Sequence, residues 1–464
     1  MGAGVSHWSL AQAVSRLGHL GVVSGTGLDQ IMARRLQDGD PQGDIRRALL
    51  QFPFRQMAER IIETYFIPGG RKPEVPYQSV GAHTVEGRRW PQEMCIAANF
   101  VEVFLAREGH SNPVGINYLE KIQMPHLPSL YGAMLAGVAV VIMGAGIPIE
   151  IPGVLDALAD HQSATYRLYV SGSQAGDVCR MTFDPAAFRE PDDGLGALLR
   201  PQFLPIVSSD ALAAVLSRKS TGAIAGFVIE GPLAGGHNAP PRGQMTLTPD
   251  GQPIYGPRDE VNMAAIRNLG LPFWLAGCYG SPERVRAALA EGAAGVQVGT
   301  AFALCTDSGV VPEMRRALIL KALAGKARVF TDPVASPTGF PFKVAELECT
   351  LSDEQVYLQR RRVCDLGFMR QVYRRPDGTL GYRCAAEPEA AYIAKGGRIE
   401  DTVGRKCLCN ALTANIGLPQ RLADGTYEKA LITLGDDFID IGRFCTQEHP
   451  DYTAADVVRI LLEA

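Results

Sequence analysis

The chain has 464 residues, which is long enough for one barrel-sized catalytic domain and additional segments. Its formal net charge of −4 excludes the concentrated positive charge that is typical of nucleic-acid-binding proteins. Apolar residues make up 46% of the chain and charged residues 20%, a composition typical of globular enzymes.

The amino terminus lacks a basic segment followed by an apolar core, so no secretory signal is predicted. Ten cysteines in such a chain are expected to be reduced thiols. Residues 131–149 are free of charge, but their four glycines and Pro148 favour a helix over 128–136 and a buried strand over 138–144 rather than a membrane span. We therefore expect a cytoplasmic protein that binds neither a membrane nor nucleic acid.

Seven short apolar runs predict the strands of an α/β fold, a (β/α)₈ TIM barrel with insertions. In chain order they cover residues 20–24, 114–118, 138–144, 203–208, 227–229, 272–277 and 295–300. A closed barrel needs every strand paired, yet the chain opens on the loop that should follow strand one. Strand one is therefore predicted to be missing; a start downstream of the true one is the favoured explanation, and a substitute strand is the alternative.

Two insertions and an extension separate this chain from a minimal barrel. The barrel is predicted to occupy residues 1–342, with insertions at about 28–107 and 149–201, and residues 343–464 form a C-terminal extension. Helical patterns mark 45–66, and an additional strand is predicted at 166–170. Insertions on the catalytic side of a barrel often form lids; a thicker wall or a homodimer contact explains them equally well.

A Gly-Gly-His sequence follows the predicted strand at 227–229, which is the sixth strand when the missing strand one is counted. Gly235 and Gly236 let the backbone approach a ligand closely, and His237 can move a proton near neutral pH. A histidine near a strand end is often only structural, which is our interpretation of the other seven. The glycine turns that follow favour a catalytic role for His237.

Those turns come at the ends of the next two strands. Ala276-Gly277 ends one strand, Ser281-Pro282 predicts a helix start after it, and Gly299-Thr300 ends the next strand. In (β/α)₈ barrels a phosphate group is commonly bound by the turns after strands seven and eight. The pattern predicts a flavin or sugar-phosphate site beneath His237.

Arg242 follows two prolines in the loop that starts at His237. Prolines stiffen such a loop, and the guanidinium group suits an anionic part of a substrate. A solvent-facing arginine is the alternative.

The extension contains four cysteines that could bind zinc or an iron–sulfur cluster, Cys364, Cys384, Cys407 and Cys409. Their spacing matches no standard zinc or ferredoxin pattern. Buried free thiols are the favoured interpretation.

The chain resembles the FMN-dependent nitronate monooxygenases, also called 2-nitropropane dioxygenases. The resemblance covers roughly residues 1–342 with gaps, and rests on the sequences MGAGVS at the start, GIN at 115–117, AGGH at 234–237, AG at 276–277 and GTAF at 299–302. It departs at Leu233, where the family usually has Glu, and at 277–280, where Gly-Cys-Tyr-Gly replaces Gly-Gly-Ile, with Gly280 as a substitute contact.

The resemblance implies a cofactor, FMN, and a set of residues around it. His237 would be the catalytic base, and Arg242 is our candidate for substrate binding. The predicted FMN contacts are Gly2, Ala3, Gly4, Asn117, Ser208, Gly235, Gly236, Ala276, Gly277, Gly280, Gly299 and Thr300.

The implied activity is FMN-dependent oxidation of a nitronate or a similar carbanion-type substrate, with oxygen as the electron acceptor. One alternative is an FMN-dependent, NAD(P)H-linked enoyl-thioester reductase, for which long insertions suit a carrier-bound substrate. The other is a non-catalytic barrel that serves as a partner protein.

Overall fold

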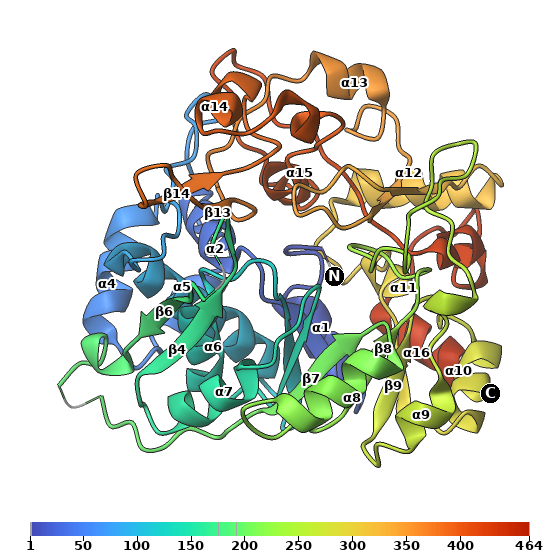
Figure 1. The fold of residues 1–464 in the computed structure, drawn as a ribbon, viewed down its shortest axis with the longest axis horizontal. Helices are drawn as coiled ribbons and strands as arrows, with labels where there is room; N and C mark the ends of the chain where they lie inside the picture. Colours follow the sequence, from blue (N-terminus) through green and yellow to red (C-terminus); the bar gives the residue numbers. More distant parts are fainter. Residues whose placement is uncertain (1, 175, 192, 464) are drawn as a thin grey trace.

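The computed structural model describes residues 2–174, 176–191 and 193–463, and its centre is one parallel sheet (Figure 1). The strands, in order across the sheet, are β1 (Gly21–Ser24), β2 (Val114–Leu119), β3 (Val140–Gly144), β7 (Gln202–Val207), β8 (Phe227–Glu230), β9 (Phe273–Ala276) and β10 (Gly295–Gln297). Every neighbouring pair is parallel. The seven predicted strands and the α/β fold class of TIM-barrel type are confirmed.

The sheet is open between its first and last strands. Among the described residues, no strand pairs with the outer edge of β1 or of β10. The amino-terminal turn contacts the end of β1 and the chain that follows α11. The amide of Ser24 donates a hydrogen bond to Ser6 O (2.8 Å), and the amide of Gly309 donates one to Val5 O (2.9 Å).

Helices connect the strands and cover the sheet. They are α1 (Trp8–Arg16), α6 (His126–Leu135), α7 (Ile151–Ala159), α8 (Asp210–Lys219), α9 (Met263–Arg267), α10 (Pro282–Ala290), α11 (Thr300–Ala303) and α12 (Pro312–Leu323). Helix α10 begins as its sequence predicts: Pro282 is its first residue, and the Ser281 hydroxyl accepts a hydrogen bond from the amide of Arg284.

The first insertion forms a second helical layer. It contains α2 (Leu28–Gln37), α3 (Asp44–Leu49), α4 (Arg55–Tyr65) and α5 (Arg89–Arg107). Helix α5 is buried along most of its length because it packs against α1, α2 and α6. This insertion therefore thickens the wall of the barrel.

The second insertion supplies short strands. The predicted strand at 166–170 is present as β4 (Ala164–Leu168), which pairs antiparallel with β6 (Cys179–Phe183). Strand β5 (Val170–Ser171) instead pairs with β13 (Gln371–Arg374), which pairs in turn with β14 (Leu380–Arg383). The second insertion and the C-terminal extension therefore share one sheet.

The chain beyond residue 325 returns repeatedly to the barrel. Strands β11 (Val329–Asp332) and β12 (Phe342–Ala345) form a hairpin. The later helices are α13 (Glu354–Gln359), α14 (Glu389–Ala394), α15 (Leu408–Ala414) and α16 (Ala454–Leu462), and the 3₁₀ helices of the chain are η1 (Pro185–Ala187), η2 (Pro257–Asp259), η3 (Ile399–Thr402) and η4 (Asp436–Arg443). Helices α13 to α15 gather at one end of the molecule, whereas α16 lies beside α1 and α10 (Figure 1).

None of the helices in the described residues is both long enough and apolar enough to cross a membrane.

Candidate functional site

Two small cavities adjoin at the carboxyl ends of the strands, with volumes of about 120 and 90 Å³. The turns after β9 and β10 line the first, and the amino-terminal turn and the end of β2 line the second. Glu230, Gly235 and Gly236 line both. The predicted residues that line one or both cavities are Gly2, Ala3, Asn117, Gly235, Gly236, His237, Ala276, Gly277, Gly299 and Thr300.

Four other predicted contacts lie elsewhere. The place where a Gly4 side chain would begin is filled by Ile416, so Gly4 faces the helical extension. Ser208 lines an outer cleft rather than the two inner cavities. Arg242 is exposed, and its guanidinium donates to Ser208 O (3.2 Å). Gly280 faces the carboxylate of Asp437. The roles of all four remain predictions.

His237 is held by the β11–β12 hairpin. The amide of Lys343 donates to Gly236 O and the amide of Asn238 donates to Pro341 O, both at 2.9 Å, so the segment 236–238 runs antiparallel to the start of β12. The His237 Nε2 atom is hydrogen-bonded to Ser336 Oγ at 2.7 Å. These contacts fix both the backbone and the ring of the histidine.

The imidazole of His237 lines the inner 90 Å³ cavity and also a large outer cleft of about 1040 Å³. Phe342 packs against its ring with centroids 4.9 Å apart. Burial lowers the pKa of His237 to about 3, because an apolar environment disfavours the charged imidazolium. The ring is therefore neutral near pH 7 and retains an unprotonated nitrogen.

Glu230 is a site residue that the sequence reasoning missed. It ends β8 and lines the outer cleft and both inner cavities. Burial raises the pKa of its carboxyl group to about 7. Its position in the sequence could have predicted a role, because a polar residue at the carboxyl end of a barrel strand is commonly functional.

The C-terminal extension forms part of the same site. Thr433 Oγ1 accepts a hydrogen bond from the amide of Gly236 (2.7 Å), and Thr300 Oγ1 accepts one from the amide of Gly435 (2.9 Å). The amide of Asp437 donates to Cys278 Sγ (3.1 Å). The segment 433–437 therefore lies directly against the turns predicted to bind phosphate.

The central part of the chain is similar to a known protein family. Residues 175–335 match the family model named nitronate monooxygenase. The resemblance to the nitronate monooxygenase family is confirmed over these residues. No curated protein matches the chain.

Solved structures that match the chain include FabK from Thermotoga maritima, with 14% identity and a TM-score of 0.47 over 99% of this chain and 89% of that chain. Nitroalkane oxidase from Streptomyces ansochromogenes is 16% identical, with a TM-score of 0.46 over 99% of this chain and 92% of that chain.

Nitronate monooxygenase family members use a flavin, and most of the residues around the inner cavities fit one. A side chain added at Gly236 or Gly299 would meet no protein atom, so both glycines face open space. Gly236 and Gly277 have φ of +87° and +98°, conformations that favour glycine. Backbone can therefore approach a planar ring or a phosphate closely at these turns.

Asp437 is the residue that fits a phosphate least well. Its carboxylate lies 3.0 Å from the point where a Gly280 side chain would begin, and burial raises its pKa. The inner cavities are also smaller than the roughly 300 Å³ at which ligand pockets begin. A flavin phosphate in these turns would therefore lie beside a buried carboxylate, which is the poorest part of the fit.

The four candidate cysteines of the extension lie in one apolar cluster. Cys384 and Cys407 are buried, and Cys364 and Cys409 pack against the same cluster. All four are free thiols. In the described residues, no three of their sulfur atoms lie within 4.8 Å of one another. Their interpretation as buried free thiols stays a prediction.

Proposed function

We propose that this protein is an FMN-dependent oxidoreductase that oxidises a nitronate or a similar carbanion-type substrate, with oxygen as the electron acceptor. One observation supports it most: two titratable side chains, His237 and Glu230, line both an open outer cleft and an inner cavity built from glycine turns. A substrate in the cleft would meet both groups on its way to the inner cavity.

The inner cavities suggest how the cofactor would be held. Gly2, Ala3 and Asn117 would contact the ring, and the turns at Gly277 and at Gly299 would contact the phosphate. The bound flavin would supply the electron-accepting chemistry.

The chain itself would supply proton transfer. A neutral imidazole can take a proton from the carbon next to a nitro group, and the hydrogen bond to Ser336 keeps the ring of His237 in one orientation. A preformed nitronate has already lost that proton, so it would not need the base.

Glu230 should give the reaction a pH dependence. Its carboxyl group, with a pKa of about 7, is protonated below that pH and becomes a proton acceptor above it. We therefore expect kcat/KM for a neutral nitroalkane to rise with pH and level off above about pH 7. The Glu230→Gln variant should lose this rise of kcat/KM with pH. A rise that persists in the variant would assign the titration to another group. His237, with its pKa of about 3, contributes no limb above pH 5.

Gly299 offers a test of cofactor placement that leaves the fold intact. Its φ is −119° and an added side chain would meet no protein atom, so Gly299→Val should unfold at the wild-type temperature. The same side chain would enter the space proposed for the phosphate, and we expect FMN to bind at least tenfold more weakly, measured by flavin fluorescence. Gly256→Val, at another open glycine outside both cavities, is the matched control. Wild-type FMN affinity in the Gly299 variant would contradict the placement.

The size of the outer cleft favours a second candidate function. Its volume of about 1040 Å³ is at the upper end of small-molecule pockets, and the second insertion forms much of its wall. A long, carrier-bound substrate suits this space better than a small nitroalkane does. The second candidate is therefore an NAD(P)H-linked enoyl-thioester reductase that uses the same FMN.

Anaerobic mixing of the purified flavin-loaded protein with single reductants tests both functions. Flavin bleaching by a nitronate but not by NADPH or NADH supports the oxidase. Rapid bleaching by either nicotinamide overturns it in favour of the reductase. A folded protein that binds no flavin overturns both and supports the non-catalytic alternative.

A further inference from the structure

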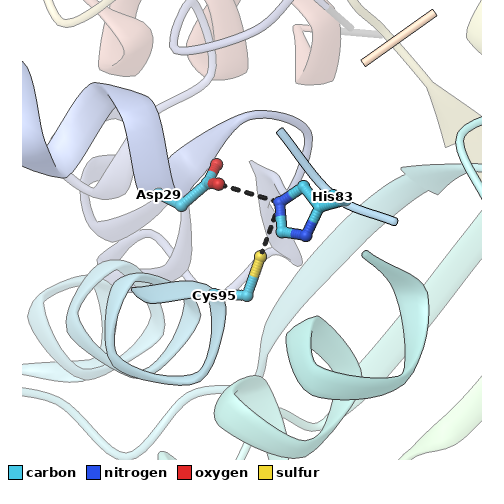
Figure 2. Close-up of side chains that lie close together, drawn as sticks. All are labelled: Asp29, His83 and Cys95. Carbon is cyan, nitrogen blue, oxygen red and sulfur yellow. Dashed lines mark hydrogen bonds and ion pairs between the residues drawn. The ribbon is translucent and has the colours of Figure 1, made fainter. Parts of the chain in front are cut away.

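Three buried side chains of the first insertion converge at one point (Figure 2). Asp29 comes from α2, His83 from the segment between α4 and α5, and Cys95 from α5. Their exposed fractions are 1%, 6% and 2%. His83 Nε2 lies 3.0 Å from Asp29 Oδ2 and 3.5 Å from Cys95 Sγ, and the three ligand atoms all lie within 4.8 Å of one another.

This spacing is the one that a tetrahedral zinc ion imposes on its ligands. Zinc binds imidazole nitrogen and carboxylate oxygen at about 2.0–2.1 Å and thiolate sulfur at about 2.3 Å. At a tetrahedral angle these bond lengths separate the nitrogen from the sulfur by about 3.5 Å and from the oxygen by about 3.3 Å. The observed separations of 3.5 and 3.0 Å are close to both. Two of the three edges between the ligand atoms therefore match a coordination tetrahedron, and the third, from oxygen to sulfur, is within 4.8 Å.

Hydrogen bonding alone leaves this cluster incomplete. Asp29 and Cys95 both face the same ring nitrogen of His83, and one N–H group points well at only one acceptor. The other carboxylate oxygen, Asp29 Oδ1, is buried and has no hydrogen-bond partner in the described part of the chain. An unpartnered buried carboxylate oxygen is costly, and a cation beside the carboxylate would lower that cost by balancing its charge.

Space for a fourth ligand adjoins the three. A cavity of about 10 Å³ is lined by Asp29 and Cys95, and also by the polar side chains of Asn99, Tyr118 and Ser129. That volume is at the lower limit for one water molecule. A water there would complete four-coordination, the number that zinc prefers.

The geometry points to a buried zinc site in which Asp29, His83 and Cys95 are the protein ligands and one water is the fourth. An ionised carboxylate and a thiolate would balance the two positive charges of the ion, which makes the buried site neutral overall. Cys95 would release its thiol proton to solvent on binding, and no electron transfer is involved.

The site would fasten the first insertion to the barrel. Its ligands come from three separate segments of that insertion, and Thr26, Gly27 and Phe368 line both the 10 Å³ cavity and the inner 90 Å³ cavity. The zinc would thus support the wall of the candidate flavin cavity from behind. The inference does not depend on the proposed function.

Metal analysis of the purified full-length protein tests the proposal. We expect about one zinc per chain after incubation with zinc and gel filtration. Cys95→Ala and His83→Ala should each retain less than one tenth of an equivalent. Cys407→Ala is the matched control, because it removes a buried cysteine of the C-terminal cluster, and should keep the full equivalent. Less than one tenth of an equivalent in the wild type, or loss of zinc in the Cys407 variant alone, would overturn the site.

Cobalt substitution keeps the test decisive if the Cys95 or His83 variants fail to fold. The wild-type protein loaded with Co²⁺ should show a near-ultraviolet thiolate-to-cobalt charge-transfer band and the visible bands of a tetrahedral ion. Cys407→Ala should retain these bands. A cobalt spectrum without a thiolate band, or one abolished by the control substitution, would place the ion elsewhere.

Discussion

Replacing His237 by asparagine should lower the turnover of a neutral nitroalkane at least a hundredfold, which is the low end of what a general base contributes. Asparagine keeps a polar side chain of similar size, so the β11–β12 hairpin and its hydrogen bonds to Gly236 and Asn238 should persist. Bound flavin should remain, because His237 is not a phosphate contact. Steady-state kinetics with a nitroalkane and an absorption spectrum of the purified variant measure the two effects.

The preformed nitronate of the same compound is the decisive second substrate. Because it has already lost the proton, the His237→Asn variant should oxidise it within about tenfold of the wild-type rate. His19→Asn, at an exposed histidine, is the control and should leave both substrates unaffected. An equal loss with the nitroalkane and the nitronate would show that His237 positions the substrate and does not take the proton.

The barrel strands could be predicted because parallel strands covered on both faces consist of almost uninterrupted apolar residues. The run 138–144 is an example: β3 occupies 140–144 and every residue of it is buried. The turn residues were equally informative, since Ser281-Pro282 placed the start of α10 correctly. These elements depend on local patterns of fewer than ten residues.

The rest of the site depends on contacts between distant parts of the chain. Thr433, Gly435 and Asp437 lie more than 130 residues beyond the turns that they contact, and nothing in the local sequence around them indicates those partners. The same holds for Ser336, which reaches His237 across 99 residues. Glu230 was predictable in principle, because its position at the end of β8 is local, but its raised pKa follows from burial by the whole fold.

The largest stability effect is expected at a buried ion pair of the C-terminal extension. The Arg360 guanidinium donates two hydrogen bonds to the Glu428 carboxylate, one of them at 2.7 Å, and the two side chains are 5% and 0% exposed. Arg360→Met leaves the carboxylate buried without a counter-ion, and of its partners only the amide of Lys429 (3.2 Å) still donates to it. We therefore expect the free energy of unfolding to fall by about 3–5 kcal/mol, measured by denaturant titration. Arg459→Met, which breaks an exposed pair with Glu463, should change it by no more than about 1 kcal/mol.

The double variant Arg360→Met/Glu428→Leu distinguishes two causes of a lower free energy of unfolding. One is a buried carboxylate without its counter-ion, and the other is the loss of the attraction between the two side chains. Replacing both partners by apolar side chains is often close to neutral, so most of the lost stability should return.

The pair also matters for the site, because Glu428 begins the segment that leads to Thr433. Within this segment Ile432 O accepts a hydrogen bond from the amide of Ala345, and Thr433 Oγ1 accepts one from the amide of Gly236. Arg360→Met should therefore weaken FMN binding as well, and the double variant should restore it. If stability returns in the double variant but FMN affinity does not, the ion pair itself, rather than the packing around it, positions the segment against the glycine turns.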